Sequence, residues 1–196
     1  MQLTGGLASH LRSASRGLIY ALVFLIPLTV LPYTIDPLEI NKQTLLVLLT
    51  LCATLLWLAS MLVEKKVRFK RGLKNKIPLV YVAAFVVPAL TSTAPYFSWI
   101  GAHRQEYTSV ATAVALGLLI YSIGNTFVDR KRHQLMHGVL VVSTALTVTA
   151  SLVAMFGLPI FGSLTSVLAF NTVGTITSFT TFLVVVIVPK FKEIFT

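Results

Sequence analysis

Residues 43–76 read QTLLVLLTLCATLLWLASMLVEKKVRFKRGLKNK, an unbroken apolar run followed by a strongly basic stretch. A helix needs roughly 20 consecutive apolar residues to cross the hydrocarbon core of a bilayer, and residues 43–63 meet that need. Residues 64–76 hold seven Lys and Arg residues. Cations beside an apolar run are typical of the cytoplasmic flank of a span. The stretch therefore predicts a membrane protein with residues 64–76 in the cytoplasm.

The rest of the chain repeats this alternation. The 196 residues are 56% hydrophobic and only 11% charged, whereas soluble domains have about 25% charged residues. Six stretches approach the length of a span: 17–35, 43–63, 77–93, 108–128, 137–158 and 170–189. We therefore predict an all-α fold, a polytopic bundle of about six transmembrane helices over 17–189. An interfacial or cytoplasmic segment, 1–16, precedes it, and a cytoplasmic tail, 190–196, follows it.

The Lys and Arg residues are divided unequally between the two sides of such a bundle. Six spans place the amino-terminal segment, the second loop, the fourth loop and the tail on one side. These segments hold Arg12, Arg16, Lys65, Lys66, Arg68, Lys70, Arg71, Lys74, Lys76, Arg130, Lys131, Arg132, Lys190 and Lys192. The opposite side holds two cations, Lys42 and Arg104. Because cation-rich short loops stay in the cytoplasm, both termini are predicted to be cytoplasmic.

Composition argues against several classes of function. The net charge of +10 is explained by attraction of the short basic loops to an anionic leaflet, so no nucleic-acid partner is predicted. The single cysteine, Cys52, excludes an intramolecular disulfide and a cysteine-rich metal site. The histidines are scattered, and no metal site is predicted. No predicted span carries Asp, Glu, Lys or Arg at its middle, which argues against a self-contained ion-coupled transporter.

Prolines and hydroxyl residues distinguish individual spans. Pro27 and Pro88 lie inside their runs and predict kinks, whereas Pro78 is predicted at a helix start, where proline costs little. The fifth span carries a row of hydroxyl residues: Ser143, Thr144, Thr147, Thr149 and Ser151. Packing and hydrogen bonding between helices is the favoured interpretation of this row. A polar substrate path is the alternative.

Lys42 and Arg104 are the candidate site residues because cations are rare on their side. The guanidinium of Arg104 offers five donors in a fixed fork that suits phosphate or carboxylate. Two structural alternatives remain open. Arg104 could pair with Glu106 or Asp36, and Lys42 could be a lysine at a helix end that extends to the interface.

The exterior loops carry motifs of a known family. Asp36-Pro37 precedes Lys42, and a Ser-x-x-Pro-x-x-Ser-x-x-Gly-x-x-Arg pattern follows the third span. Its residues are Ser92, Pro95, Ser98, Gly101 and Arg104, and a segment rich in Asn, Gly, Thr and Ser, 170–179, comes later. With these motifs the chain resembles the amino-terminal half of the O-antigen ligase and O-antigen polymerase superfamily. Its members are bacterial inner-membrane enzymes of the C-type glycosyltransferase class, active in building the cell envelope and its lipopolysaccharide.

The resemblance implies a substrate and a role for each candidate. Family members transfer a glycan from an undecaprenyl-pyrophosphate carrier to an acceptor outside the cytoplasmic membrane. Arg104 and Lys42 would help to bind the pyrophosphate and stabilise it as a leaving group, and no metal or cofactor is required. The chain departs from the family after Arg104, where a glycine is common and Glu106 stands here, followed by Tyr107.

The same resemblance bears on completeness and partners. It places the catalytic residues in a second half beyond residue 196, so no catalytic residue is assigned here. The chain is expected to be truncated, or to work with a second half-protein or as a homo-oligomer. The alternative function is a non-enzymatic membrane module or one half of a transporter.

Overall fold

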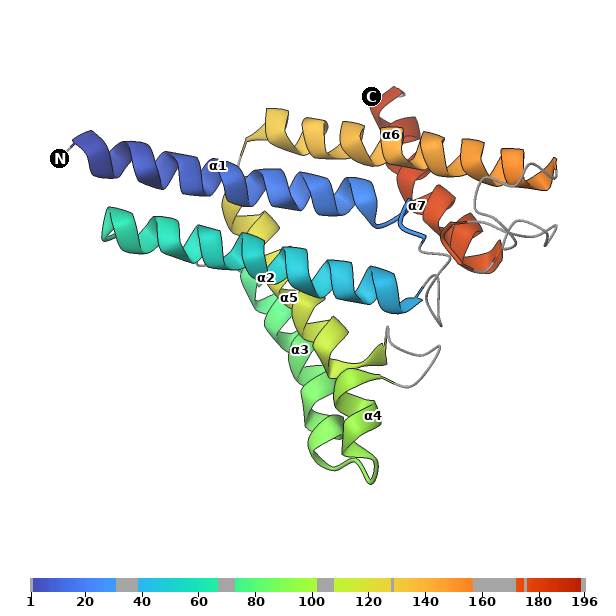
Figure 1. Ribbon diagram of the computed structural model, residues 1–196, viewed down its shortest axis with the longest axis horizontal. Coiled ribbons are helices and arrows are strands. Elements are labelled where there is room, and N and C mark those ends of the chain that lie inside the picture. The colour runs from blue at the N-terminus through green and yellow to red at the C-terminus, as the bar shows by residue number, and fades with distance from the viewer. Residues whose placement is uncertain are drawn as a thin grey trace. The chain divides into compact units, whose positions relative to one another are not determined.

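A computed structural model describes residues 2–30, 39–66, 73–101, 108–127, 129–156, 172–174 and 176–194. Over these residues the chain forms seven α-helices and no strand (Figure 1). The helices are α1 (Gln2–Leu25), α2 (Glu39–Glu64), α3 (Leu73–Leu90), α4 (Pro95–Ile100), α5 (Val110–Thr126), α6 (Arg130–Met155) and α7 (Ile176–Ile194). The all-α prediction is confirmed for this part of the chain.

Two helices are long and apolar enough to cross a bilayer, judged by length and composition. They are Ile40–Glu64 in α2 and Arg130–Ala154 in α6. Shorter apolar helices cover three further predicted spans: Lys76–Leu90, Val110–Thr126 and Thr177–Val188. The arrangement with six spans stays a prediction.

Helix ends differ from the predicted span ends. The basic residues predicted to form the fourth loop are the first turn of α6, which begins at Arg130. Helix α7 continues through Lys190 and Lys192 of the predicted tail to Ile194. Apolar runs mark the residues that suit a membrane, whereas a helix continues for as long as its backbone hydrogen bonds do. Lys and Arg are good helix formers, so a charge does not end a helix.

Two proline predictions were wrong. Helix α1 ends at Leu25, and Pro27 lies in the turn that follows, where Leu28 N–H and Thr29 N–H both donate to the Leu25 carbonyl, at 3.0 and 2.9 Å. Proline lacks an N–H and disfavours helical geometry in the residue before it, so it ends this helix and does not kink it. Pro78 is the sixth residue of α3, which begins earlier than predicted, at Leu73.

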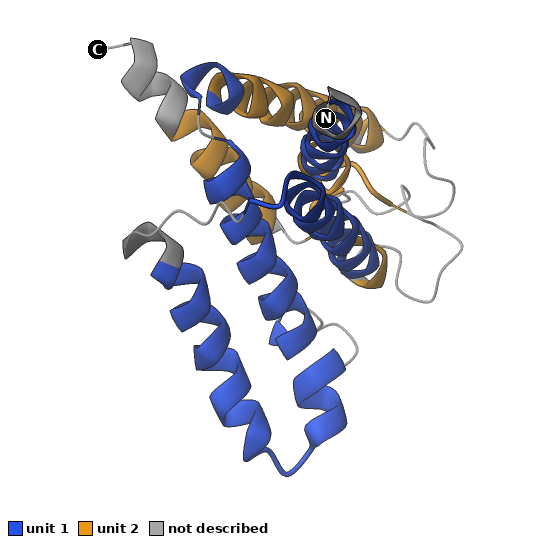
Figure 2. Cartoon of the chain, turned by 90° about the vertical axis from the view of Figure 1, so that its left-hand side faces the viewer, with its two compact units in different colours: residues 1–22, 43–133 blue, residues 23–42, 134–196 orange. Residues whose placement is uncertain are grey.

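The chain divides into two compact units (Figure 2). Unit 1 consists of Met1–Leu22 and Gln43–His133, and unit 2 of Val23–Lys42 and Gln134–Thr196.

In unit 1, α1 and α2 run antiparallel. Ser15 Oγ donates to the Ala53 carbonyl at 2.7 Å, and Arg12 pairs with Glu64 at 2.5 Å. Helices α3, α4 and α5 pack on one another.

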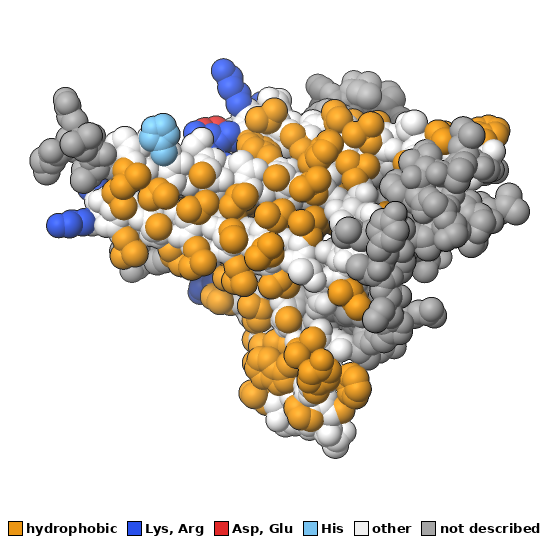
Figure 3. Space-filling model, in the orientation of Figure 1, with side chains coloured by type: hydrophobic (Ala, Val, Ile, Leu, Met, Phe, Trp, Pro, Cys, Tyr) orange, Lys and Arg blue, Asp and Glu red, His pale blue; other side chains and the backbone are white. Residues whose placement is uncertain are grey.

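Unit 1 buries many small and hydroxyl side chains beside large apolar ones such as Trp57 and Phe127, and it exposes many other large apolar side chains. Small and hydroxyl side chains are buried between helices, among them Ala53, Ala113, Ala115, Ser15, Thr54, Ser60, Ser109, Thr112 and Ser122. Large apolar side chains face outward, including Leu48, Leu55 and Leu62 at seven-residue spacing along α2. Hydrophobic side chains accordingly cover much of the face in Figure 3. Small residues inside and large apolar residues outside are typical of helices that pack in lipid.

In unit 2, the hydroxyl row of α6 makes one bond to another helix and several within its own. Ser143 Oγ donates to the Phe24 carbonyl of α1 at 2.7 Å. Thr144, Thr149 and Ser151 each donate to the carbonyl four residues earlier. The bond of Ser143 supports the packing interpretation of this row.

Candidate functional site

The motif Ser92, Pro95, Ser98, Gly101 forms the turn between α3 and α4 and the whole of α4. Ser92 Oγ accepts from Ala94 N–H at 3.2 Å and from Ser98 Oγ at 2.7 Å. Pro95 occupies the first helical position, where its missing N–H costs nothing. Gly101 ends α4 with a φ of 110°, a conformation that disfavours a side chain. Each spacing in the motif thus has a local structural role.

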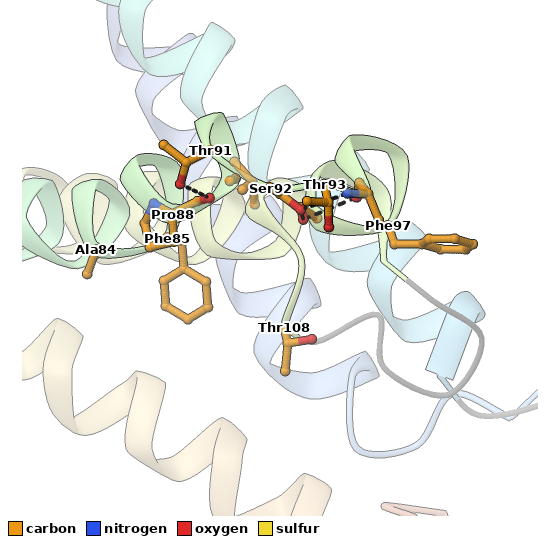
Figure 4. Close-up of a pocket in the computed structure, with 12 residues that line it drawn as sticks. Ala84, Phe85, Pro88, Thr91, Ser92, Thr93, Phe97 and Thr108 are labelled. Atoms are coloured by element: carbon orange, nitrogen blue, oxygen red, sulfur yellow. Dashed lines mark hydrogen bonds between the residues drawn. The ribbon is translucent and has the colours of Figure 1, made fainter.

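A pocket opens beside this turn (Figure 4). Its volume is about 620 Å³. One part of its wall is apolar, from Ala84, Phe85, Pro88, Ala89, Phe97 and Val110, and the other carries hydroxyls, from Thr91, Ser92, Thr93, Ser98 and Thr108. Figure 4 shows the hydroxyl residues of the turn between Pro88 of α3 and Phe97 of α4, with Thr108 on the chain that leads into α5. The lining suits a ligand with both a polar and an apolar part.

Gln43, in the first turns of α2, holds the chain on both sides of the segment 102–107. Its amide nitrogen is a donor to the Ile100 carbonyl at 3.1 Å, to Ser109 Oγ at 3.0 Å and to Thr112 Oγ1 at 2.9 Å. Ser109 caps α5, since its Oγ accepts from Thr112 N–H at 3.2 Å. One side chain therefore joins the end of α4 to the start of α5.

Sequence reasoning did not select Gln43, Ser109 or Thr112. A signal was present for Ser109, because a serine directly before a long apolar run is a helix-start signal. Gln43 gave only the weak signal of a polar residue beside the rare cation Lys42. Its partners lie 57 to 69 residues away along the chain, which no local pattern encodes.

Several predicted site residues lie outside the part of the chain that the structure describes. They are Asp36, Pro37, Arg104, Glu106 and Tyr107. The residues that flank the segment of Arg104 are described: Gly101 on one side, and Thr108, which lines the pocket, on the other. The roles of Arg104 stay predictions.

Lys42 is buried within unit 2, with 4% of its surface exposed. Its ammonium donates to the carbonyl of Thr172 and, at 3.1 Å, to that of Val173. These carbonyls belong to the segment before α7 that carries the third family motif. Burying an ammonium is costly unless its donors are satisfied, and the carbonyls satisfy this need. Lys42 therefore joins the start of α2 to the approach to α7.

Comparisons of the chain with protein families, with curated proteins and with solved structures give no match.

Proposed function

We propose that the chain is a multi-pass protein of the bacterial cytoplasmic membrane that takes part in transferring a glycan from a polyprenyl-pyrophosphate carrier. With the predicted six spans and cytoplasmic termini, the α3–α4 turn, its pocket and Arg104 would lie at the exterior face. The acceptor would lie on that side. The observation that carries the proposal is the pocket at this turn, whose wall is part apolar and part hydroxyl.

The chemistry of the pocket matches an amphiphilic carrier. Prenyl groups bury apolar surface, for which Phe85, Pro88 and Phe97 offer a wall. A hydroxyl such as that of Thr93 can donate to a phosphate oxygen. The lining supports binding at the junction between the apolar prenyl tail and the charged pyrophosphate of the carrier.

Arg104 is the proposed electrostatic partner of the pyrophosphate. In the transfer, the acceptor oxygen bonds to the anomeric carbon, and the bond from that carbon to the phosphate oxygen breaks. The pyrophosphate leaves with the electron pair, and a base takes the acceptor's proton. Negative charge grows on the leaving group, and a bidentate guanidinium stabilises it. Gln43 bonds to described residues on either side of the segment 102–107, namely Ile100 and Ser109.

Lys42 is proposed as a second cation that binds the pyrophosphate. Its contacts with the protein determine which measurement can test this role. Its bonds to the carbonyls of Thr172 and Val173 give it a structural role as well. Lys42→Met would therefore lower stability whether or not Lys42 binds the ligand. The informative quantity is the affinity of the folded fraction for undecaprenyl pyrophosphate, and Lys42→Arg keeps the charge as a control.

The test of the proposal is retention of undecaprenyl pyrophosphate by the chain in nanodiscs, measured by native mass spectrometry. Hydrogen bonds to charged groups contribute about 1.5–3 kcal/mol. We expect Arg104→Ala to weaken binding by roughly 10- to 150-fold at about 1.4 kcal/mol per factor of ten. Lys65→Ala, an equal charge loss on the predicted cytoplasmic side, should change it less than about twofold.

The alternative, a non-enzymatic membrane module or half of a transporter, gives opposite results. It predicts a symmetric dimer and no retention of undecaprenyl pyrophosphate by the wild-type chain. If Arg104→Ala instead bound undecaprenyl pyrophosphate with wild-type affinity, the role of Arg104 would be rejected, but binding in the pocket would not. Glycan transfer by the whole protein in its native membrane, with and without Arg104→Ala, then tests the reaction itself.

A further inference from the structure

A group of arginines from two helices gathers at the opposite end of unit 1 from the pocket. Arg12 and Arg16 lie four residues apart on one face of α1, and Arg132 lies in the first turn of α6. Edge-to-face packing of Tyr20 on Phe127, with ring centroids 5.2 Å apart, brings the α5–α6 connection to this face of α1. In Figure 3, Lys and Arg side chains lie in separate groups near the end of α2 and near the beginning of α6.

Two of these three arginines have a carboxylate, and the third does not. Arg12 pairs with Glu64 at 2.5 Å, and Arg132 pairs with Asp129 at 3.1 Å. Among the residues that the structure describes, Arg16 has no hydrogen bond or ion pair. It is half-buried. Burial, together with repulsion from Arg132 and Arg12, lowers the pKa of the Arg16 guanidinium from its ordinary value, although Asp129 and Tyr20 oppose this shift. Arg16 is thus a half-buried guanidinium that Asp129 attracts but that has no carboxylate in direct contact among the described residues.

We propose that Arg16, flanked by Arg12 and Arg132, binds a phosphate group carried by an anionic phospholipid. A guanidinium has five donors in a planar fork that matches phosphate oxygens. A phosphate at this position adds negative charge where Arg12, Arg16 and Arg132 outnumber the carboxylates Glu64 and Asp129. This site is separate from the pocket at the α3–α4 turn and does not depend on the function proposed there.

Apolar surface on the adjoining helix favours a lipid as the source of the phosphate. Leu58 and Leu62 lie four residues apart on α2, and both are exposed, Leu62 by 78%. The same helix ends at Glu64, the partner of Arg12. Acyl chains covering these leucines would bury apolar surface. Free inorganic phosphate could bind Arg16 in the same way, but it has no apolar part that would cover these leucines.

The test compares the chain in nanodiscs of phosphatidylcholine with and without phosphatidylglycerol. The readouts are phosphatidylglycerol retained by the protein in native mass spectrometry and the thermal midpoint of unfolding. Arg16→Gln is compared with Arg130→Gln, which removes the same charge from an exposed neighbour in the first turn of α6. Adding inorganic phosphate separates a lipid site from a site for the free anion.

We expect Arg16→Gln to reduce the retention of phosphatidylglycerol at least tenfold and Arg130→Gln to reduce it less than about threefold. Phosphatidylglycerol should raise the thermal midpoint of unfolding only where Arg16 is present. In pure phosphatidylcholine, Arg16→Gln should unfold no earlier than the wild type, because it removes the burial cost of the guanidinium and its repulsion from Arg132 and Arg12, which exceed the attraction to Asp129. Phosphatidylglycerol that inorganic phosphate does not displace identifies the lipid, and displacement identifies the free anion. Equal losses for the two variants, or earlier unfolding of Arg16→Gln in pure phosphatidylcholine, would overturn the proposal.

Discussion

Gly117 of α5 is the position at which one added methyl group should disturb the packing of unit 1 most clearly. A Cβ atom at this residue would overlap the Cγ2 methyl of Val82 in α3 and lie 3.5 Å from the Pro78 carbonyl. Valine in a helix has one strongly preferred rotamer, so Val82 cannot simply turn away. Gly117→Ala therefore forces α3 and α5 apart or forces Val82 out of its rotamer.

Two opposing effects determine how much stability Gly117→Ala loses. Overpacking a well-packed contact costs typically 1–3 kcal/mol. A hollow of about 280 Å³, lined by Val82, Gly117 and Tyr121 among others, gives Val82 some room, so we expect about 1–2 kcal/mol. Replacing glycine by alanine inside a helix offsets about 1 kcal/mol of this. The net loss of stability is then about 0–1 kcal/mol, and a control is needed to isolate the packing cost.

Gly138 in α6 provides that control. A Cβ atom there meets nothing within 4 Å, so Gly138→Ala gains the helix preference without a clash. The difference between the two variants isolates the packing cost, about 1–2 kcal/mol. The double variant Gly117→Ala, Val82→Ala lacks the methyl that clashes. In the Val82→Ala background, Gly117→Ala should therefore no longer carry the packing cost that it has in the wild type.

The assay is a denaturation titration in SDS with mixed micelles, followed by tryptophan fluorescence. The chain has two Trp residues, and a Trp99→Phe background leaves Trp57 as the reporter. Trp57 is 4% exposed and packs edge-to-face on Tyr121 of α5, with ring centroids 6.0 Å apart. Equal unfolding midpoints for Gly117→Ala and Gly138→Ala would refute close packing of α3 on α5 at this position.

Three further predictions follow from buried polar groups, each checked by the same titration. Gln43→Leu removes the amide that joins α2 to the end of α4 and the start of α5, and it should lower the free energy of unfolding by about 1–2 kcal/mol. Gln43→Glu keeps acceptor atoms but loses the donors, so it should be no more stable than Gln43→Leu. Thr147→Val should leave stability unchanged or raise it by about 1 kcal/mol, because the Thr147 hydroxyl is buried without a hydrogen-bond partner in the described part of the chain. Ser143→Ala should cost about 0.6 kcal/mol through its lost bond to the Phe24 carbonyl, whereas Thr149→Ala, whose bond lies within its own exposed turn, should change stability less.

The sequence was most informative where one local property decides the structure. Apolar runs of span length located α2 and the main part of α6, because a helix is the only open structure that satisfies its own backbone in lipid. Helix ends were predicted less well. Hydropathy did not indicate that Arg130 begins a helix or that α3 starts five residues before Pro78, since neither depends on an apolar side chain. Pro27 ended α1 because backbone chemistry outweighed the continuing apolar run.

The sequence marked the residues of the α3–α4 turn but not their contacts. Ser92, Ser98 and Gly101 were selected only as motif residues in an expected exterior loop, and in the structure they build the turn before α4 and its end. The serine contacts span six residues, so they are encoded locally. The bonds of Gln43 to Ser109 and Thr112 join helices far apart in sequence. They depend on how α2 packs against α5, which charge and periodicity do not specify.

Lys42 shows what a count of charges can and cannot establish. The count selected it because a cation on the side predicted to hold few cations needs a reason to be there. The expected reason was a ligand, with a lysine at a helix end as the alternative, and the contacts in the described residues are carbonyl oxygens of Thr172 and Val173. A charge is equally well satisfied by a phosphate or by the open carbonyls of an irregular segment, so rarity identifies the residue but not its partner. Arg104 was selected by the same rarity, and the fixed fork of its guanidinium is the separate reason for assigning a phosphate to it.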